Sequence, residues 1–295
     1  MSASHYRPQN KKQKTVLITG CSTGIGYCVA KGLKQRGYRV IATARREDSV
    51  KQLIKEGFES LALDLSNSES IQLAFKEVLQ LTDGNLYALF NNGAFGLPGA
   101  VEDLSRENLK VQFETNVFGW LELTNLVIPL MRKQGFGRII QNSSVLGFVA
   151  MPFRGAYNAS KYAIEGLSDT LRLELKGSNV FISLIEPGPI TSQFRANAVK
   201  AMQQHIDIEN SIHREKYLGV LERLNKKGPA VPFTLPPEAV LKRVIYILES
   251  KKPQPRYYVT FPTYLFAFLK RFLSHRQLDY LLTKAGNDSK QKISP

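Results

Sequence analysis

Cysteine is scarce in this chain of 295 residues, which contains only Cys21 and Cys28. The two lie seven positions apart, and no group of histidines stands near them. Secreted domains that depend on disulfides carry many cysteines, and a structural zinc site needs several closely spaced ligands. The composition therefore argues against a disulfide scaffold, indicates no metal site, and is typical of a reducing compartment.

Long apolar segments are absent as well. The first 14 residues are polar and lack the apolar core of a secretory signal. Near the C-terminus the longest apolar run, 264–269, has six residues, whereas a membrane-spanning helix needs about 20. We therefore expect a cytoplasmic protein without a transmembrane helix.

Acidic residues are few, because 25 Asp and Glu stand against 40 Lys and Arg, which gives a net charge of +15. The excess gathers at the ends: residues 1–14 hold four basic and no acidic side chains, and residues 251–295 hold nine basic and two acidic ones. Such ends suit anionic lipid or nucleic acid, or they serve only as solubilising tails. We expect no nucleic-acid binding, because no aromatic-and-basic recognition motif is present.

Short apolar runs alternate with helical patterns from residue 15 to about residue 190. The runs are 16–19, 39–43, 60–63, 86–91, 138–142 and 180–185. Between them apolar residues recur at three- and four-residue spacing, as at Ile71, Phe75 and Val78. This alternation predicts a single α/β domain of the Rossmann type, a doubly wound parallel sheet with helices on both faces.

A glycine-rich sequence follows the first predicted strand directly. Residues 19–26 read TGCSTGIG and lead into a helical pattern. Glycines in this context let the backbone turn tightly and approach a pyrophosphate, and the helix N-terminus supplies N–H donors. The spacing differs from the commonest dinucleotide fingerprint, so the strand–loop–helix context carries the prediction.

The second predicted strand ends in ATARR, residues 42–46. Proteins that bind NAD usually place an acidic residue at this strand end, where it meets the ribose. Arg45 and Arg46 stand here instead, and arginine suits a 2′-phosphate in charge and geometry. We therefore expect NADP(H) as the preferred cofactor and NAD(H) as the second option, unless both arginines are only solvated loop charges.

Tyr157 and Lys161 lie four residues apart at the start of a helical pattern, which puts them on one helix face. A free phenol has a pKa of about 10, and a neighbouring ammonium that lowers it equips the phenol for acid–base work near neutrality. Ser144 follows the strand 138–142, and ligand-binding groups collect at the carboxyl ends of parallel strands. We expect Tyr157 and Ser144 to act on the same carbonyl oxygen.

Together these sequences resemble the short-chain dehydrogenase/reductase family over about residues 15–260. The matching motifs are TGCSTGIG (19–26), Asp64, NNGA (91–94), Asn116, NSS (142–144), YNASK (157–161) and PGPIT (187–191). The sequences of these motifs are similar to those of NADP-dependent aldehyde reductases and of the hydroxysteroid and retinol dehydrogenase-like branch. One departure is NNGA, because the family usually has NNAG.

The resemblance implies a role for each matched residue. It implies Asn116, Ser144, Tyr157 and Lys161 as the catalytic set, in which Asn116 holds a helix distortion and a water, and Lys161 binds the nicotinamide ribose. Implied cofactor contacts are Gly20, Ser22, Thr23, Gly24, Ile25, Gly26, Arg45, Arg46, Asp64, Leu65, Asn92, Gly93, Tyr157, Lys161, Pro187, Gly188, Ile190 and Thr191. Relatives often pair through the tyrosine-bearing helix, so a homodimer or tetramer is expected.

The implied activity is NADP(H)-dependent hydride transfer between an apolar aldehyde or ketone and its alcohol, with Tyr157 as general acid or base. Apolar residues after the strands and in the segment 191–235 favour an apolar substrate. The alternative is a non-catalytic NADP-binding regulator, against which the complete catalytic set speaks. His205 and His213 have no evident partner in the sequence and are expected to be solvated.

These expectations divide the chain into three parts. Residues 1–14 form a disordered basic segment, residues 15–262 the catalytic domain with a substrate lid at about 191–235, and residues 263–295 a basic amphipathic tail. The tail either packs on the body, takes part in an oligomer or makes peripheral contact with a membrane surface.

Overall fold

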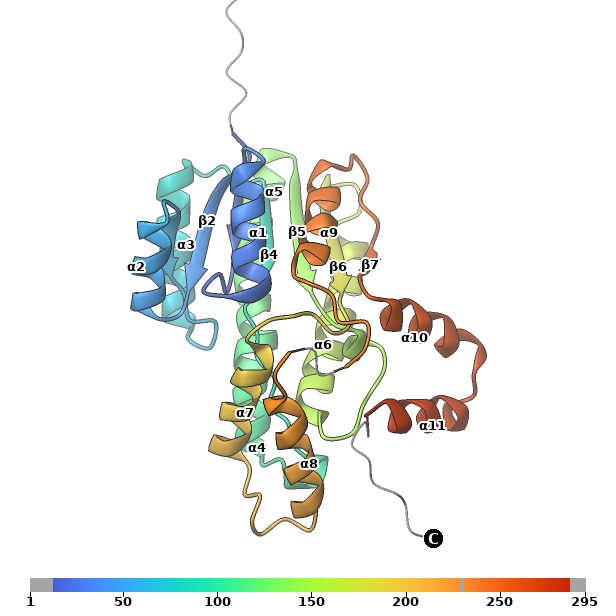
Figure 1. Cartoon of the computed structure of the whole chain (residues 1–295). Helices are drawn as coiled ribbons and strands as arrows, with labels where there is room; N and C mark the ends of the chain where they lie inside the picture. The colour runs from blue at the N-terminus through green and yellow to red at the C-terminus, as the bar shows by residue number, and fades with distance from the viewer. Residues whose placement is uncertain (1–12, 229–230, 287–295) are drawn as a thin grey trace, which may run out of the picture.

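The computed structural model describes residues 13–228 and 231–286. Within them seven strands form one parallel sheet in the order β3-β2-β1-β4-β5-β6-β7 (Figure 1). The strands are β1 (Thr15–Ile18), β2 (Arg39–Ala44), β3 (Glu59–Ala62), β4 (Ala88–Asn91), β5 (Gly137–Asn142), β6 (Val180–Glu186) and β7 (Arg256–Tyr258). The sheet and its helices confirm the predicted Rossmann-type architecture.

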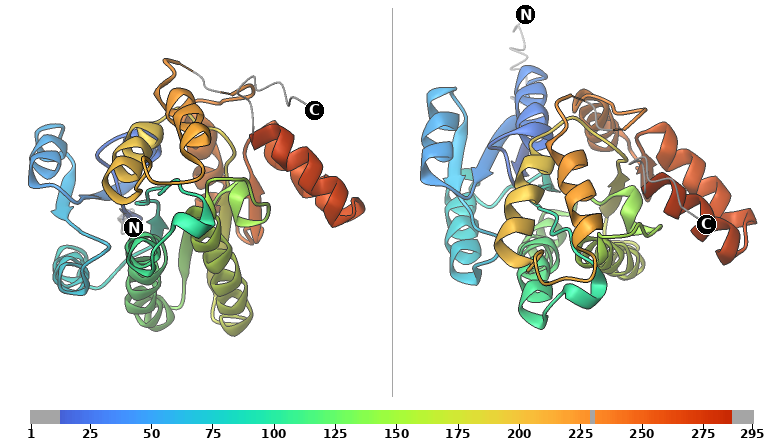
Figure 2. Two further views of the ribbon diagram at one scale, coloured as in Figure 1. Left: turned by 90° about the horizontal axis from the view of Figure 1, so that it is seen from below. Right: turned by 60° about the horizontal axis from the view of Figure 1, so that its bottom comes forward.

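Helices cover both faces of this sheet (Figures 1 and 2). The α-helices of the described residues are α1 (Gly24–Gln35), α2 (Glu47–Lys55), α3 (Ser68–Thr82), α4 (Arg106–Phe113), α5 (Gly119–Gln134), α6 (Gly155–Glu174), α7 (Phe194–His205), α8 (Arg214–Asn225), α9 (Glu238–Glu249), α10 (Phe261–Phe272) and α11 (His275–Gly286). Val29 of α1 and Val244 of α9 are buried on one face. Trp120 of α5 and Ile164 of α6 are buried on the other.

The order of the strands places a cleft above the centre of the sheet. The chain first moves outward from β1 to β2 and β3, and then returns to add β4 on the other side of β1. At the carboxyl end of β1, Ile18 pairs with Ala42 of β2 and with Phe90 of β4. Loops leaving neighbouring strands in opposite directions create a crevice there, which is where open α/β sheets bind ligands.

Two pairs of helices extend the domain beyond the sheet (Figure 2). α7 and α8 pack together over an apolar cluster that includes Met202 and Tyr217. α10 and α11 bury Phe266 and Leu278 against the turn η3 (Val145–Gly147), between the predicted catalytic serine and tyrosine. The C-terminal helices are therefore part of the wall around the cleft.

The two ends of the chain lie largely outside the described residues. Apart from residues 13 and 14, the segment 1–14 lies outside the described residues, and so do residues 287–295 of the tail. Along the described ranges no helix combines the length and hydropathy needed to cross a bilayer. The same part of the chain contains no group of three or more His, Cys, Asp or Glu side chains arranged to hold a metal ion.

Candidate active site

A cavity of about 1520 Å³ opens over the carboxyl ends of the strands. Arg45 and Arg46 line it where β2 ends, and Tyr157 lines it where α6 begins. Between them it passes the loop that leads from β1 into α1. The cavity therefore joins the predicted cofactor residues to the predicted catalytic residues.

The glycine-rich loop makes the close approaches that its sequence predicts. Gly20 has φ +70°, and a Cβ on it would come 2.6 Å from the Gly93 Cα atom. Gly24 has φ +61°, in the left-handed region that favours glycine. Thr23, at the N-cap of α1, makes no side-chain capping hydrogen bond, so the first N–H groups of the helix have no partner in its side chain.

Gly26 differs from its predicted role, because it does not line the cavity. A Cβ at this position would come 2.2 Å from the Gly20 carbonyl oxygen and 2.6 Å from Nδ2 of Asn92. The residue lies beneath the loop and lets α1 pack against it. Gly26 therefore shapes the cradle without forming its surface.

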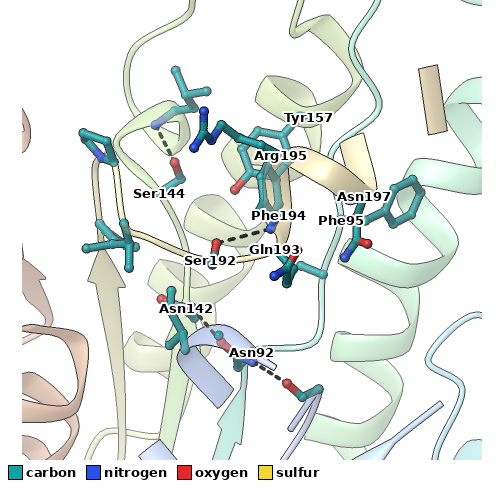
Figure 3. Close-up of a pocket in the computed structure, with 18 of the residues that line it drawn as sticks. Asn92, Phe95, Asn142, Ser144, Tyr157, Ser192, Gln193, Phe194, Arg195 and Asn197 are labelled. Carbon is teal, nitrogen blue, oxygen red and sulfur yellow. Dashed lines mark hydrogen bonds between the residues drawn. The ribbon is translucent and has the colours of Figure 1, made fainter. Parts of the chain in front are cut away.

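Asn92 and Gly93 are held against the glycine-rich loop. The Thr19 hydroxyl accepts hydrogen bonds from both backbone N–H groups at 2.9 Å, and Asn92 Nδ2 donates to the Thr19 carbonyl at 3.0 Å. Asn92 Oδ1 in turn accepts from Asn142 Nδ2 at 3.0 Å (Figure 3). A Cβ on Gly93 would lie 3.0 Å from Leu65 Cδ1 and 3.3 Å from Gly20 N, so the order NNGA suits this tight contact.

Asp64 and Leu65 form the cavity wall after β3. Asp64 Oδ1 accepts hydrogen bonds from the Ser66 backbone at 3.0 Å and from the Ser66 hydroxyl at 2.7 Å. The Leu65 carbonyl lies against Gly119, where a Cβ would come within 1.9 Å of its oxygen. These contacts, of which the last is with α5, fix the part of the wall where the resemblance implies cofactor contacts at Asp64 and Leu65.

Tyr157 and Ser144 come together at the far end of the cavity (Figure 3). The ring of Phe194 packs edge-on against that of Tyr157, with centroids 5.3 Å apart. Phe194 can come this close because residue 96 is glycine, and a Cβ there would lie 2.8 Å from the Phe194 ring. Ser144 is 8% exposed, and its hydroxyl accepts a hydrogen bond from Leu146 N at 3.1 Å.

The predicted lowering of the Tyr157 pKa is not found. Burial raises the pKa of Tyr157 to about 12, and a hydrogen bond with Ser144 offsets part of this rise. Lys161 is not among the causes of this pKa shift. Its Nζ donates to the Asn142 carbonyl at 2.8 Å and lies 4.3 Å from the centre of the Trp120 ring and 5.7 Å from that of Tyr157. Burial also lowers the pKa of Lys161 itself to about 7, which weakens its charge near neutrality.

Asn116 lies at the helix distortion that the resemblance implies. It is fully buried in η2 (Glu114–Phe118), a π-helical turn between α4 and α5. Its side chain donates to the Phe95 carbonyl at 2.9 Å and to the Ser160 hydroxyl at 3.1 Å, and accepts from Phe95 N at 3.2 Å. Asn116 therefore fastens the irregular helix to α6 and stands behind the cavity surface.

A partly buried charged cluster beside Lys161 was not predicted from the sequence. Arg256 of β7 pairs with Glu165 at 3.1 Å, with Asp169 at 2.7 Å and with Glu186 at 3.1 Å. Burial raises the pKa of Glu186 to about 8 and also raises that of Glu165. Glu165 follows Lys161 by one helical turn, and its charge acts to keep the lysine protonated. The available signal in the sequence was Glu186, an acidic residue at the end of the largely apolar strand β6.

The histidine expectation is wrong for His213. Its Nε2 pairs with Oε1 of Glu102, and its ring packs edge-on against Phe153 at 5.5 Å. His205 lines the cavity. The partner of His213 comes from a segment more than 100 positions away, which spacing in the sequence does not reveal.

Comparison with known proteins agrees with this geometry. The family model for short chain dehydrogenases matches residues 14–203. The uncharacterized oxidoreductase YbbO of Escherichia coli is 43% identical over 270 residues, which cover 92% of this chain and 94% of YbbO. Human retinol dehydrogenase 8 is 37% identical over 191 residues, which cover 61% of this chain and 60% of that protein.

A solved structure shows the same likeness. Actinorhodin polyketide ketoreductase, a variant solved with NADPH, superimposes with a TM-score of 0.68 at 25% identity, covering 84% of this chain and 95% of that one. The sequence comparisons, the fold and the site residues thus indicate the same family over the region that carries the motifs. The chain belongs to the short-chain dehydrogenase/reductase family and is an oxidoreductase.

Proposed function

We propose that the protein is an NADP(H)-dependent reductase that converts an apolar aldehyde or ketone into its alcohol. The observation that carries this proposal is the continuous cavity, which has two arginines at one end and the Tyr157–Ser144 pair at the other. The complete catalytic set favours an enzyme over the alternative, a non-catalytic regulator that binds NADP.

The residues present fit a dinucleotide. The cradle at Gly20 has no room for a Cβ, and Gly24 is in the left-handed region, as close backbone approach to a pyrophosphate requires. Arg45 and Arg46 are exposed at the end of β2 and line the cavity. Glu47 and Asp48 belong to the first turn of α2 and do not line it. This charge distribution supports NADP(H) over NAD(H).

A bound nicotinamide supplies the hydride. Tyr157 donates the proton to the substrate oxygen, because its phenol is protonated at neutral pH both at the ordinary pKa of about 10 and at the raised pKa. The Ser144 hydroxyl donates a hydrogen bond to the same oxygen, where negative charge develops. Phe194 covers the tyrosine ring and keeps water from this side of the site. Lys161 and Asn116 hold the surrounding backbone through the contacts described above.

The activity is tested by oxidation of NADPH and NADH with a panel of medium-chain aldehydes, retinoids and ketosteroids. We expect turnover with apolar carbonyl compounds and NADPH, and slower turnover with NADH. Absence of turnover with every compound, together with tight NADPH binding, would favour the non-catalytic alternative. The panel also identifies the preferred carbonyl class.

We also propose peripheral contact with anionic membranes through α10. Phe261, Leu265, Phe268 and Phe272 are spaced along one face of this helix and are 57%, 38%, 60% and 70% exposed. Phe261 and Leu265 also line the cavity. Exposed Arg271 supplies charge suited to anionic lipid. Apolar substrates would then reach the cavity directly from the lipid surface.

Flotation with anionic and neutral liposomes tests this contact. The double variant Phe268→Ser/Phe272→Ser should bind anionic liposomes less than the parent chain does. The control variant Ile54→Ser/Leu73→Ser changes two exposed apolar residues on α2 and α3 and should bind as the parent chain does. Equal flotation of all three proteins would contradict the proposal.

Assembly into a homodimer or tetramer through α6 and its neighbour stays a prediction.

A further inference from the structure

Arg154 lies at the start of α6 and lines the same cavity as Tyr157. Its backbone is fixed from two sides, because it forms a parallel bridge with Gly99 and its carbonyl accepts a hydrogen bond from Asn158 N at 2.7 Å. A Cβ on the next residue, Gly155, would come 2.5 Å from Val101 Cγ2. The Arg154 side chain therefore extends from a closely packed corner.

The guanidinium of Arg154 has no carboxylate partner within the described ranges. Its Nη1 atom is buried without a hydrogen-bond partner. The charged group that acts on it is Arg223 of α8, which has the same sign. Burial, and secondarily Arg223, lower the pKa of Arg154 to about 9, which leaves the guanidinium charged at neutral pH. Buried charges in proteins are costly unless they are paired, so this cation is set up for an anion from outside the chain.

The surrounding wall has the same polarity. Besides Arg154 and Arg223, the α7 residues Arg195 and Lys200 line the cavity. The acidic residues that line it within the described part of the chain are Asp64 and Glu114. Asp64 follows β3 on the dinucleotide side, and neither carboxylate forms an ion pair with Arg154. Among the described residues, the substrate side thus combines apolar surface with more basic than acidic side chains.

The position of Arg154 also sets a distance from the reacting carbonyl. Arg154 is the N-cap residue of α6, so it lies just under one helical turn before Tyr157, and a turn rises about 5 Å along the axis. Arg154 precedes Tyr157 by three residues at the beginning of α6. A ligand whose oxygen meets Tyr157 can therefore place an anionic group near the guanidinium only if a short apolar chain separates the two groups.

We infer that the substrate is an oxo acid, an aldehyde or ketone whose apolar chain carries a carboxylate that pairs with Arg154. The planar guanidinium matches a carboxylate with two parallel hydrogen bonds. This inference rests on the proposed carbonyl reduction and narrows its substrate from apolar carbonyl compounds in general to amphiphilic ones. Arg154 is on this account a specificity-determining residue.

The test compares a short-chain ω-oxo carboxylate with its neutral methyl ester and with the straight-chain aldehyde of equal length. For the full chain with NADPH we expect kcat/KM to be about tenfold or more higher for the acid. Arg154→Met should abolish this ratio, and Arg154→Lys should restore part of it. Arg106→Met, at an exposed arginine of α4, should keep the ratio of the parent chain.

Further measurements separate the outcomes. NADPH binding and thermal unfolding of Arg154→Met report on folding, and removal of a charge that has no counter-ion should not lower Tm. Inhibition of the parent chain by a saturated monocarboxylate, compared with the corresponding alcohol, tests the anion site without any variant. Reduction of the neutral aldehyde without preference for the acid, or weaker inhibition by the carboxylate, overturns the inference alone. Absence of reduction for all three compounds overturns the proposed function itself.

Discussion

Tyr157→Phe should reduce the turnover number for carbonyl reduction by about a hundredfold or more, because the variant has no proton to donate to the substrate oxygen. The phenol hydroxyl is the only group removed, and the ring can keep its edge-on contact with Phe194. NADPH binding should therefore change little. Steady-state kinetics with the best carbonyl compound of the panel and NADPH fluorescence titration provide the two measurements.

Tyr162→Phe is the matched control for this variant. Tyr162 lies on the same helix, is 42% exposed and does not line the large cavity. Its loss should leave both kinetics and cofactor binding at the level of the parent chain. Substantial turnover in Tyr157→Phe would show that another group supplies the proton.

Replacement of both Arg45 and Arg46 with alanine should raise KM for NADPH by about ten- to a hundredfold and leave KM for NADH nearly unchanged. Each hydrogen bond from a guanidinium to an anionic phosphate contributes about 1.5–3 kcal/mol. NADH has no 2′-phosphate, so it loses no such contact. Initial-rate kinetics with both cofactors at a fixed carbonyl concentration measure the change in preference.

Lys51→Ala with Lys55→Ala removes the same amount of charge from exposed positions of the neighbouring helix α2. This control should leave the preference for NADPH intact, which distinguishes local contacts from the effect of net charge. An equal rise of both KM values in the arginine variant would indicate that the two residues support the loop and do not read the phosphate.

The sequence was most informative where one local pattern decides the structure. The glycines in TGCSTGIG and the alternation of strands and helices predicted the cradle and the sheet, because backbone turns and hydrophobic periodicity are local properties. The position of Ser144 after the strand 138–142 likewise predicted that it lies near Tyr157. Strand β7 (Arg256–Tyr258) was missed, since three residues give no periodic signal and depend on pairing with β6.

Properties that depend on distant contacts could not be predicted in this way. The pKa of Tyr157 follows from burial and from the hydrogen bond with Ser144, which lies outside α6. The cluster around Arg256 combines residues of β6, α6 and β7. That Arg154 has no carboxylate partner among the described residues is visible only once the surrounding side chains are placed. Electrostatics inside the domain are set by tertiary packing, and sequence spacing contains little of that information.

The central claim is that Tyr157 and Ser144 act on a carbonyl held next to a bound nicotinamide. A crystal structure of this chain with NADP⁺ and an unreactive substrate analogue measures this directly. We predict that both hydroxyl oxygens lie within hydrogen-bond distance, about 3 Å, of the analogue oxygen, on the nicotinamide side of the cavity. A complex in which the Tyr157 hydroxyl points away from the nicotinamide would contradict the account.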